Sequence, residues 1–437
     1  MLIRNLFKST SGNRPVDRLV SLLLLLSPML GLACGTVNPQ RESLAEYYWE
    51  SQNLRFRGGS STKGAEALRD LGVIYLRTGH YQKAYDVLSR SLVQDRSDPK
   101  RWFYAGLAQE LLGREDAALS TYERFLSLSS TSIYTRAMRG RAAWLQDAAT
   151  RDLLYATSRD TDTQRFGELV ENRYAVFPLE CVSDTPEYKA LGTGLSDIIS
   201  NDLESLRNVD MIDPHLVRMA YAAAEEAVNR AGTSRPVWAG KTLGASRIVG
   251  GTCRVDSDET IDVDLILRDL ASDEVYSVSG RDRVQNIATL EQSLIRDLAT
   301  QLRIWIPDRE GYTTTTLPTF DALIFYSDGI VSEDSGALET SLAAYDRALA
   351  AHPTFVLADV RRIALVNKLL ARSTGQDDLV DLVVRLESAN YLTYNLDMRI
   401  NQLGFNVGST LVPSQDTRKL PPGNLGELPT PPSPVRN

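Results

Sequence analysis

Between residues 173 and 304, short apolar runs alternate with longer amphipathic segments. Tyr174–Glu180 is an apolar run interrupted by a proline, which predicts a buried strand. Two amphipathic helices follow, then a strand over 247–252, an alternating hairpin over 261–278 and a helix over 287–302. Because strands and helices interleave, residues 172–306 predict one α/β domain with a mixed sheet.

Small features mark where elements of this domain begin, turn and pack. Asp213 precedes Pro214, so an N-cap carboxylate is followed by a residue suited to the first helical position. The hairpin turns at Ser272-Asp273, and aspartate tolerates the left-handed backbone that such turns use. The pair Gly192 and Gly194 lacks the third glycine of a phosphate-binding fingerprint. We interpret these two glycines as sites of helix–sheet packing.

A repeated pattern of glycine, alanine and large apolar positions precedes this domain. Leu68, Gly72, Gly79, Ala84 and Leu88 correspond to Trp102, Gly106, Gly113, Ala118 and Tyr122. The spacing resembles the tetratricopeptide repeat, in which small residues let two helices of a hairpin approach and large ones fill the gap. Gly140 keeps the spacing, and residues 142–155 predict a capping helix. We therefore expect stacked helical hairpins over residues 65–160.

A further unit of this kind follows the α/β domain, after a linker at 307–320. Its repeat residues are Phe325, Gly329, Gly336, Tyr345, Ala348 and Pro353. Helices near 355–372 and 377–389 extend it, so that helical hairpins span 321–393. The predicted fold class is α plus α/β, with helical hairpins on both sides of a central mixed-sheet domain. The tail over 394–437 is rich in proline and poor in apolar residues, which predicts disorder.

The α/β domain resembles the CsgG-like domain. The resemblance rests on the opening strand, the 191–203 helix, the turn and strand over 243–252 and the hairpin over 261–278. That domain belongs to the curli-secretion component family and is close to FlgO-type and TolB-amino-terminal-type envelope domains. The resemblance implies a role in envelope assembly or export, and it raises the possibility of a homo-oligomer formed through the α/β domain.

The segment 1–33 predicts a signal peptide, because basic residues precede the apolar core Leu19–Ala33. Gly31-Leu32-Ala33-Cys34 resembles a bacterial lipobox, which implies lipidation of Cys34. Because Gly35 rather than aspartate follows, the resemblance implies retention at the outer membrane, facing the periplasm. Gly31 and Ala33 also suit ordinary signal peptidase, which is the alternative. Residues 34–64 then form a leader before the first repeat.

Composition and motifs argue against several classes of function. The 437 residues carry a formal net charge of −8, which disfavours a nucleic-acid-binding surface. The sequence has no P-loop, no H-E-x-x-H, no G-x-S-x-G and no C-x-x-C. Its three histidines, His80, His215 and His352, are far apart in sequence and suggest no ligand set. We therefore predict no catalytic residue, no metal, no cofactor and no enzyme.

Two cysteines remain if Cys34 carries lipid, namely Cys181 and Cys253. An even number in an oxidising compartment is compatible with pairing, and both residues come just after strands of the same predicted sheet. A disulfide between them is therefore possible. Two small buried thiols are the alternative.

Repeat proteins commonly bind partners on the concave side, which the first helix of each hairpin lines. The repeat offsets place seven residues on that side: Arg69, Val73, Leu76, Arg77, Phe103, Leu107 and Glu110. A mixed apolar and basic groove suits a protein or peptide segment of acidic character. Alternatively, some of these side chains pack against the capping helix or the α/β domain.

These observations predict a lipid-anchored envelope scaffold that binds protein partners through its repeats. The alternative is a subunit of a CsgG-type oligomeric export pore. Such a pore needs additional amphipathic strands, whereas the clear alternation at 260–268 and 274–279 already belongs to the core sheet. The scaffold is therefore the favoured hypothesis.

Overall fold

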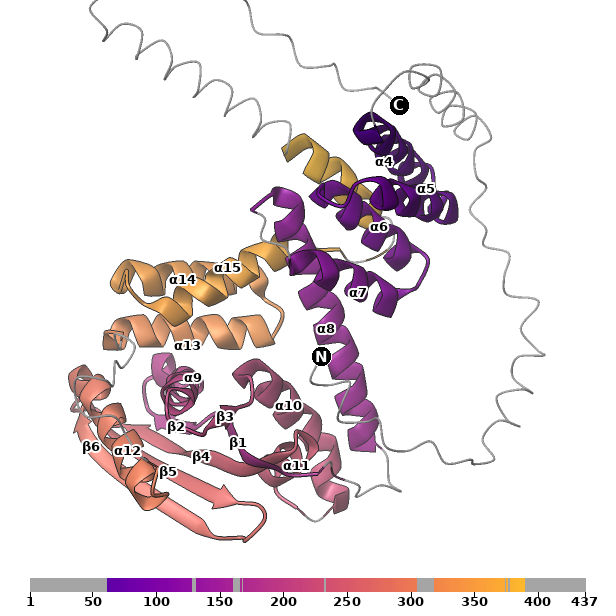
Figure 1. Cartoon of the computed structure of the whole chain (residues 1–437). Helices are drawn as coiled ribbons and strands as arrows, with labels where there is room; N and C mark the ends of the chain where they lie inside the picture. Colours follow the sequence, from indigo (N-terminus) through magenta and orange to yellow (C-terminus); the bar gives the residue numbers. More distant parts are fainter. Residues whose placement is uncertain are drawn as a thin grey trace, which may run out of the picture. The chain divides into compact units, whose positions relative to one another are not determined.

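The first four described helices pair as two hairpins, with a long fifth helix behind them. They are α4 (Ser61–Arg77), α5 (Tyr81–Gln94), α6 (Pro99–Leu111), α7 (Glu115–Leu126) and α8 (Ile133–Arg159) (Figure 1). This computed structural model describes residues 61–127, 131–159, 166, 168–231, 233–304, 318–373, 375 and 378–389. The chain divides into units 1–383 and 384–437, and every contact reported below lies within the first.

Each hairpin is closed by a glycine of its first helix against a large side chain of its second. A Cβ atom on Gly72 would lie 2.4 Å from Cγ of Leu88, and one on Gly106 would lie 2.2 Å from a ring carbon of Tyr122. Side chains at these glycines would overpack the interface. The predicted helical repeat is therefore confirmed by its packing, and its spacing follows from this glycine contact.

The α/β domain contains a six-stranded mixed sheet. Its strands are β1 (Val170–Val176), β2 (Glu180–Ser183), β3 (Asp210–Met211), β4 (Ala245–Val255), β5 (Thr260–Asp269) and β6 (Val275–Arg283). The order is β3-β1-β4-β5-β6, and β2 also pairs with β4. Strand β1 pairs in parallel with β3 and β4, and β2 pairs in parallel with β4, whereas β5 is antiparallel to both β4 and β6.

The structure divides the predicted opening strand in two. Strands β1 and β2 pair one after the other with the same strand, β4. Residues 177–179 separate them. Proline at 178 has no N–H to donate, which suits a break in the ladder. On β4, a Cβ atom at Gly251 would lie 1.9 Å from the backbone oxygen of Asp264, so the two backbones approach too closely there for a side chain.

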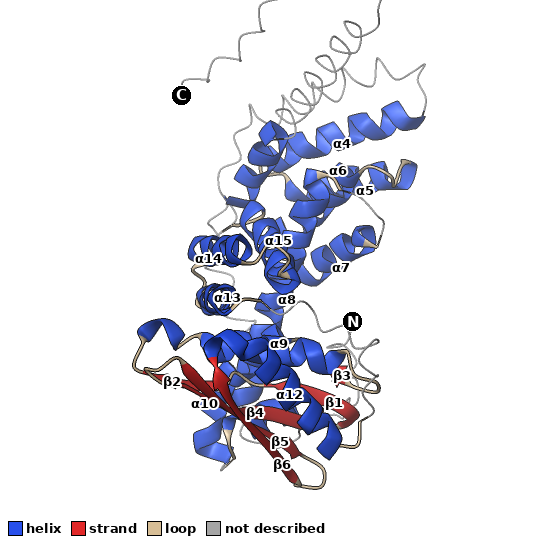
Figure 2. Ribbon diagram, turned by 90° about the vertical axis from the view of Figure 1, so that its left-hand side faces the viewer, coloured by secondary structure: helices blue, strands red, loops and turns tan. Residues whose placement is uncertain are grey.

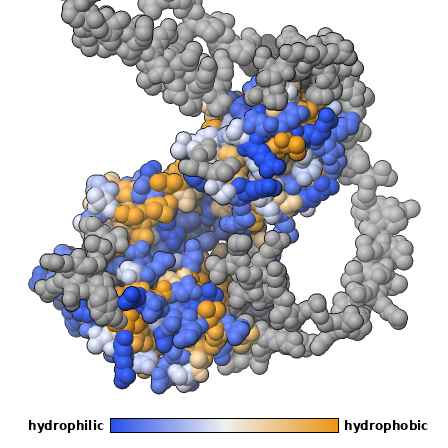
Figure 3. Space-filling view, viewed as in Figure 1, coloured by the Kyte–Doolittle hydropathy of each residue, from blue (hydrophilic) through white to orange (hydrophobic). Residues whose placement is uncertain are grey.

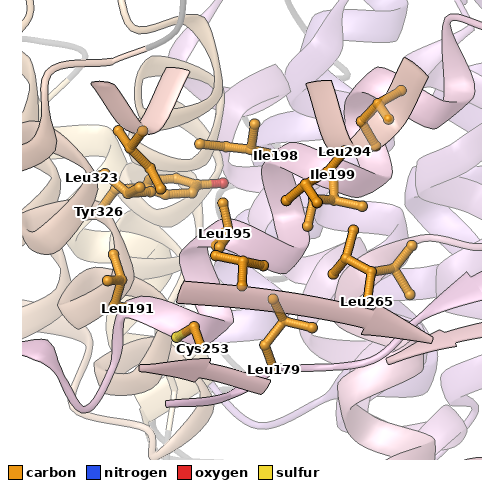
Figure 4. Packing of buried hydrophobic residues seen from close by; sticks show 14 of the residues in the cluster. Leu179, Leu191, Leu195, Ile198, Ile199, Cys253, Leu265, Leu294, Leu323 and Tyr326 are labelled. Carbon is orange, nitrogen blue, oxygen red and sulfur yellow. The ribbon is translucent and has the colours of Figure 1, made fainter. Parts of the chain in front are cut away.

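Helices cover the sheet in two layers (Figure 2). The larger core places α9 (Leu191–Glu204) and α12 (Ile287–Gln301) against the inward side chains of β5, namely Ile261, Val263, Leu265 and Leu267 (Figure 4). A second core contains α10 (Pro214–Ala231) and α11 (Arg235–Thr242) with Ala175 and Phe177. Two short 3₁₀ helices, Pro186–Tyr188 and Val284–Asn286, precede α9 and α12. Sequence patterning did not predict α11.

Two predicted local features of this domain are confirmed. Asp213 caps α10, because its Oδ1 accepts a hydrogen bond from the backbone N–H of His215 at 2.7 Å. Asp273 has a φ of 64° in the β5–β6 turn, so it adopts the left-handed conformation expected there. Both features depend on neighbouring residues in the chain, which is why the sequence was sufficient to predict them.

The third repeat unit packs directly on the α/β domain. It consists of α13 (Phe320–Asp334) and α14 (Leu338–Ala351), followed by α15 (Val356–Leu370). Gly329 faces Tyr345 as the other repeat glycines face their partners, with a Cβ-to-ring separation of 2.4 Å. A Cβ atom on Gly194 of α9 would lie 2.0 Å from Oγ of Ser327. The prediction of helix–sheet packing is therefore wrong for Gly194, because its close neighbour is α13 rather than the sheet.

Helix α15 closes the first repeats by packing on α8. A Cβ atom on Gly140 would lie 2.0 Å from the backbone oxygen of Asn367 and 2.7 Å from Cβ of Ala371. The indole N–H of Trp144 donates to the carbonyl of Lys368 at 3.0 Å. Gly140 therefore keeps the repeat spacing, but its partner comes from α15, on the far side of the α/β domain in the sequence.

Several predicted segments lie outside the described residues. These are the signal peptide over 1–33, Cys34, residues 34–60 of the leader, most of the 307–320 linker and the tail over 394–437. Within the part of the chain that is described, no helix combines the length and the apolar character needed to span a bilayer.

Candidate functional site

The seven residues predicted to line a concave groove lie on α4 and α6, and most of them are not available to a partner. Leu76, Phe103 and Leu107 have no exposed surface, and Glu110 is 7% exposed. Phe103 lies within an aromatic cluster, with ring centroids 5.4 Å from Tyr104 and 5.9 Å from Tyr134 of α8. The prediction that these four residues line an open groove is wrong, because all four are buried. For the three on α6, the helix α8 packs against α6 and α7 on this side.

The Glu110 carboxylate makes buried contacts within the protein and is not free to bind a partner protein. Its carboxylate forms an ion pair with Arg141 of α8 and accepts a hydrogen bond from the hydroxyl of Tyr122 at 2.6 Å. Arg141 also donates to the carbonyl of Ala371 at 3.2 Å. Burial, followed by the neighbouring Glu110 charge, raises the pKa of Tyr122 well above its usual value. This cluster holds the second repeat, α8 and the end of α15 together.

The three remaining groove residues are on α4. Arg69 forms ion pairs with Asp70 and Asp98, both at 2.8 Å. Val73 is half-buried, and Arg77 is exposed at the end of the helix. Of the predicted set, Arg77 is therefore the residue that remains accessible.

A buried charge network connects the α/β domain to the third repeat unit. Asp197 of α9 is 4% exposed and accepts from Arg218 of α10 at 2.7 Å. It also accepts from Arg361 of α15 and from the hydroxyl of Tyr326 of α13, the latter at 3.1 Å. Arg361 further donates to the Tyr326 hydroxyl at 3.0 Å. One carboxylate thus joins four helices, and both of its oxygens are hydrogen-bonded, as a buried charge requires.

The network continues to α8 through His215. The His215 imidazole lies between Asp147 of α8, at 3.4 Å, and Asp334 of α13, at 3.5 Å. These two carboxylates, Asp147 first, raise the pKa of His215 to about 9 against the opposing effect of burial. Lys368 of α15 pairs with Asp147 at 2.9 Å and with Glu333 of α13 at 3.4 Å. His215 therefore carries a proton at neutral pH. It lies between one carboxylate of α8 and one of α13.

A second buried acidic pair lies between α9 and α12. Asp202 and Glu291 are 2% and 1% exposed. Burial, followed by the neighbouring Asp202, raises the pKa of Glu291 well above its usual value, and burial also raises the pKa of Asp202. The protonated form of Glu291 is thus favoured, since two ionised carboxylates would repel each other in this apolar interface.

Neither cluster offers an evident catalytic arrangement. The network groups are engaged with one another, and no group of three or more His, Cys, Asp or Glu residues in the described part of the chain is arranged to hold a metal ion. Sequence reasoning missed both clusters because their members are spread from residue 147 to residue 368. A polar residue on the apolar face of a predicted helix, such as Asp197 or Asp202, is the signal that was available.

Cys181 and Cys253 form a disulfide bond. They are register partners on the parallel strands β2 and β4, with Cα atoms 4.5 Å apart. Cys253 is buried below the α9 layer, at 1% exposure (Figure 4). The bond ties the short strand β2 to the centre of the sheet.

An apolar surface lies open on the third repeat unit. In the space-filling view, hydrophobic residues gather over α14 and α15 (Figure 3). Val356, Val360 and Ile363 of α15 are 55%, 59% and 48% exposed. Their spacing places them on one helical face. Contiguous exposed apolar residues of this kind commonly mark binding surfaces.

Comparisons with known proteins find similar structures at low identity. No family model matches the chain, and no curated protein matches its sequence. TTC0263, a thermophilic TPR protein of Thermus thermophilus, is 12% identical over 69% of this chain and 98% of its own, with a TM-score of 0.19. Yeast Tom70 is 12% identical over 79% of this chain and 69% of its own, also with a TM-score of 0.19. At these TM-scores, the assignment of the repeats rests on the glycine contacts described above.

Proposed function

We propose that this protein is a non-enzymatic scaffold of the bacterial cell envelope that binds a protein partner through its helical repeats. The observation that carries the proposal is the exposed apolar face of α15 on a frame of stacked helical hairpins. A rigid array of hairpins displays such a face without needing a reactive group. The buried network around Asp197 supports this role, because it holds the repeat unit in a defined position on the α/β domain.

An envelope location is supported by two independent features. The Cys181–Cys253 disulfide is of a kind that persists in oxidising compartments. The signal-like segment ending at Cys34 then directs export, and lipidation of Cys34 anchors the protein at the outer membrane, facing the periplasm. The resemblance to the CsgG-like domain adds a role in envelope assembly or export to this proposal, with an oligomer through the α/β domain as a further possibility.

The export-pore alternative is less well supported. Its subunits would need amphipathic strands with an apolar face turned to lipid. The alternating apolar set of β5 (Ile261, Val263, Leu265 and Leu267) is at most 1% exposed, beneath α9 and α12. Within the described residues, this alternation therefore serves the domain core, which favours the scaffold.

Affinity purification from detergent-solubilised envelopes tests the proposal. A tagged full-length chain is expected to fractionate with membranes and to retain a partner protein at a constant ratio through two orthogonal columns. The Cys34→Ala variant should move to the soluble periplasmic fraction and keep the partner. A wild-type protein that is already soluble would contradict the anchor. A chain that retains no partner in either form would contradict the scaffold.

A further inference from the structure

The exposed half of α15 forms a continuous apolar surface. Ala364 is exposed beside Val356, Val360 and Ile363, and these four residues are called the α15 face below. No polar residue interrupts the face, since the positions between them turn toward the neighbouring helices or the rim. The face extends over roughly 12 Å, at 1.5 Å per residue along the helix.

The same side of α15 already packs against a helix further along. Continuing from Ile363 in steps of four leads to Asn367 and Ala371, which lie against Gly140 of α8. The contact is close, since a Cβ atom on Gly140 would lie 2.0 Å from the Asn367 backbone oxygen. The α15 face is therefore the uncovered continuation of an existing helix-to-helix interface.

The edge of the α15 face toward α14 is acidic, whereas Arg136 of α8 lies at the C-terminal end of the face, where it donates to Asn367 at 3.2 Å. The side chains of Asp359 and Asp346 are 48% and 59% exposed. Arg362 lies between them, at 3.0 Å from Asp359 and 3.9 Å from Asp346. Two carboxylates around one guanidinium leave a net negative charge beside the apolar residues. A ligand with basic side chains at the edge of an apolar stripe would complement this arrangement.

We propose that the α15 face binds an amphipathic α-helix of a partner protein, with aliphatic side chains on one side and lysine or arginine at its edge. This inference rests on the proposed scaffold function and names its docking surface and the kind of partner. A helix suits the site because α8 uses the same side of α15 in this way. Apolar anchors spaced three and four residues apart are the usual means by which such helices bind.

Peptide titration tests the chemistry of the α15 face. The probe is a fluorescent designed helix of about five turns with a leucine stripe flanked by lysines, and its control carries glutamates in place of the lysines. Titrated against the full chain in a Cys34→Ala background, the lysine peptide is expected to bind at least several-fold more tightly than the glutamate peptide. Val360→Asp should weaken binding of the lysine peptide at least tenfold. Val93→Asp, at a 77% exposed position on α5, should leave it unchanged.

Both substituted side chains are solvent-exposed, so the melting temperatures of the two variants should match that of the parent chain. Equal binding of the lysine peptide to the parent and to Val360→Asp would overturn the proposal, as would equal binding of the two peptides. A dimer of the parent chain that Val360→Asp abolishes in sedimentation would also overturn it, because a second copy would then occupy the face.

Photocrosslinking in cells separates this proposal from the scaffold itself. A photoreactive residue at position 360 is expected to crosslink a partner segment that digestion maps to an amphipathic, basic-edged helix. The same residue at exposed Arg77 is the reference position. Crosslinks from position 77 alone would overturn the α15 face and leave the scaffold standing. Crosslinks from neither position, together with a failed affinity purification, would contradict both the α15 face and the scaffold function.

Discussion

Arg361 of α15 donates to Asp197 of α9, a residue 164 positions earlier in the chain. This contact joins the third repeat unit to the α/β domain, and Arg218 completes it from α10. Replacing Asp197 would leave Arg218 paired with Asp334 alone and Arg361 paired with Glu333 alone, so each buried guanidinium would lose one counter-charge. The stability of the whole arrangement therefore depends on a few side chains that lie far apart in sequence.

Substitution of Asp197 by alanine is expected to lower the free energy of unfolding by about 3–5 kcal/mol, because Arg218 and Arg361 each lose one carboxylate partner in a buried site. Urea unfolding followed by circular dichroism measures the change. Glu339→Ala is the matched control, since the Arg372–Glu339 pair is 44% and 70% exposed and such pairs contribute roughly 0–1 kcal/mol. Equal losses in the two variants would contradict the structural role of Asp197.

His215 gives the fold a pH dependence of defined sign. Its pKa is raised from 6.5 to about 9 in the folded state, so the folded chain binds the proton more tightly than the unfolded chain. The resulting stabilisation is fully present below pH 6.5 and is lost as the pH rises toward 9. His215→Gln should therefore destabilise the protein by about 2–3 kcal/mol at pH 6 and much less at pH 9.5. Chemical unfolding at both pH values checks this, and a difference independent of pH would contradict it.

Glu291 is expected to show a pH dependence in which the folded state retains the proton. Its pKa is raised by burial and by Asp202, so the folded chain keeps a proton that the unfolded chain releases above its ordinary pKa. This residue therefore reduces stability progressively as the pH rises above that ordinary value. Glu291→Gln mimics the protonated form and should raise the melting temperature at pH 7.5, with little effect at pH 4. Calorimetry at the two pH values measures the change, and a lower melting temperature at pH 7.5 would contradict the raised pKa of Glu291.

Phe103 is expected to behave as a core residue. Phe103→Ala removes a fully buried ring from the cluster of Tyr104, Tyr122 and Tyr134, so it should cost about 3–5 kcal/mol of stability. Thermal unfolding measures the loss. Arg77→Ala, at an exposed position on α4, is the comparison and should change stability by less than about 0.5 kcal/mol. An unchanged melting temperature for Phe103→Ala would contradict the core role of Phe103 and would support the predicted binding surface.

Local pattern was sufficient to predict the repeat hairpins and several elements of the α/β domain, although it missed α11 and β3. The glycine spacing predicted the hairpins because Gly72 and Leu88, or Gly106 and Tyr122, meet within one repeat. Alternation in β5 predicted a buried strand face, and Asp213 predicted the start of α10. In each case the partner is a sequence neighbour, or the pattern itself identifies the side of the element that must be covered.

Only the tertiary structure decided which element packs against each apolar face. Repeat offsets placed Phe103 and Glu110 on a predicted concave side, but they carried no information that Tyr134 and Arg141 of α8 occupy it. The sequence likewise does not show which residues of the charge network pair with one another, because its members are spread over five helices from Asp147 to Lys368. Periodicity specifies which face of a helix is apolar, whereas the identity of the neighbour on that face depends on how distant segments pack. That packing buries the predicted groove and leaves α15 with the exposed apolar face.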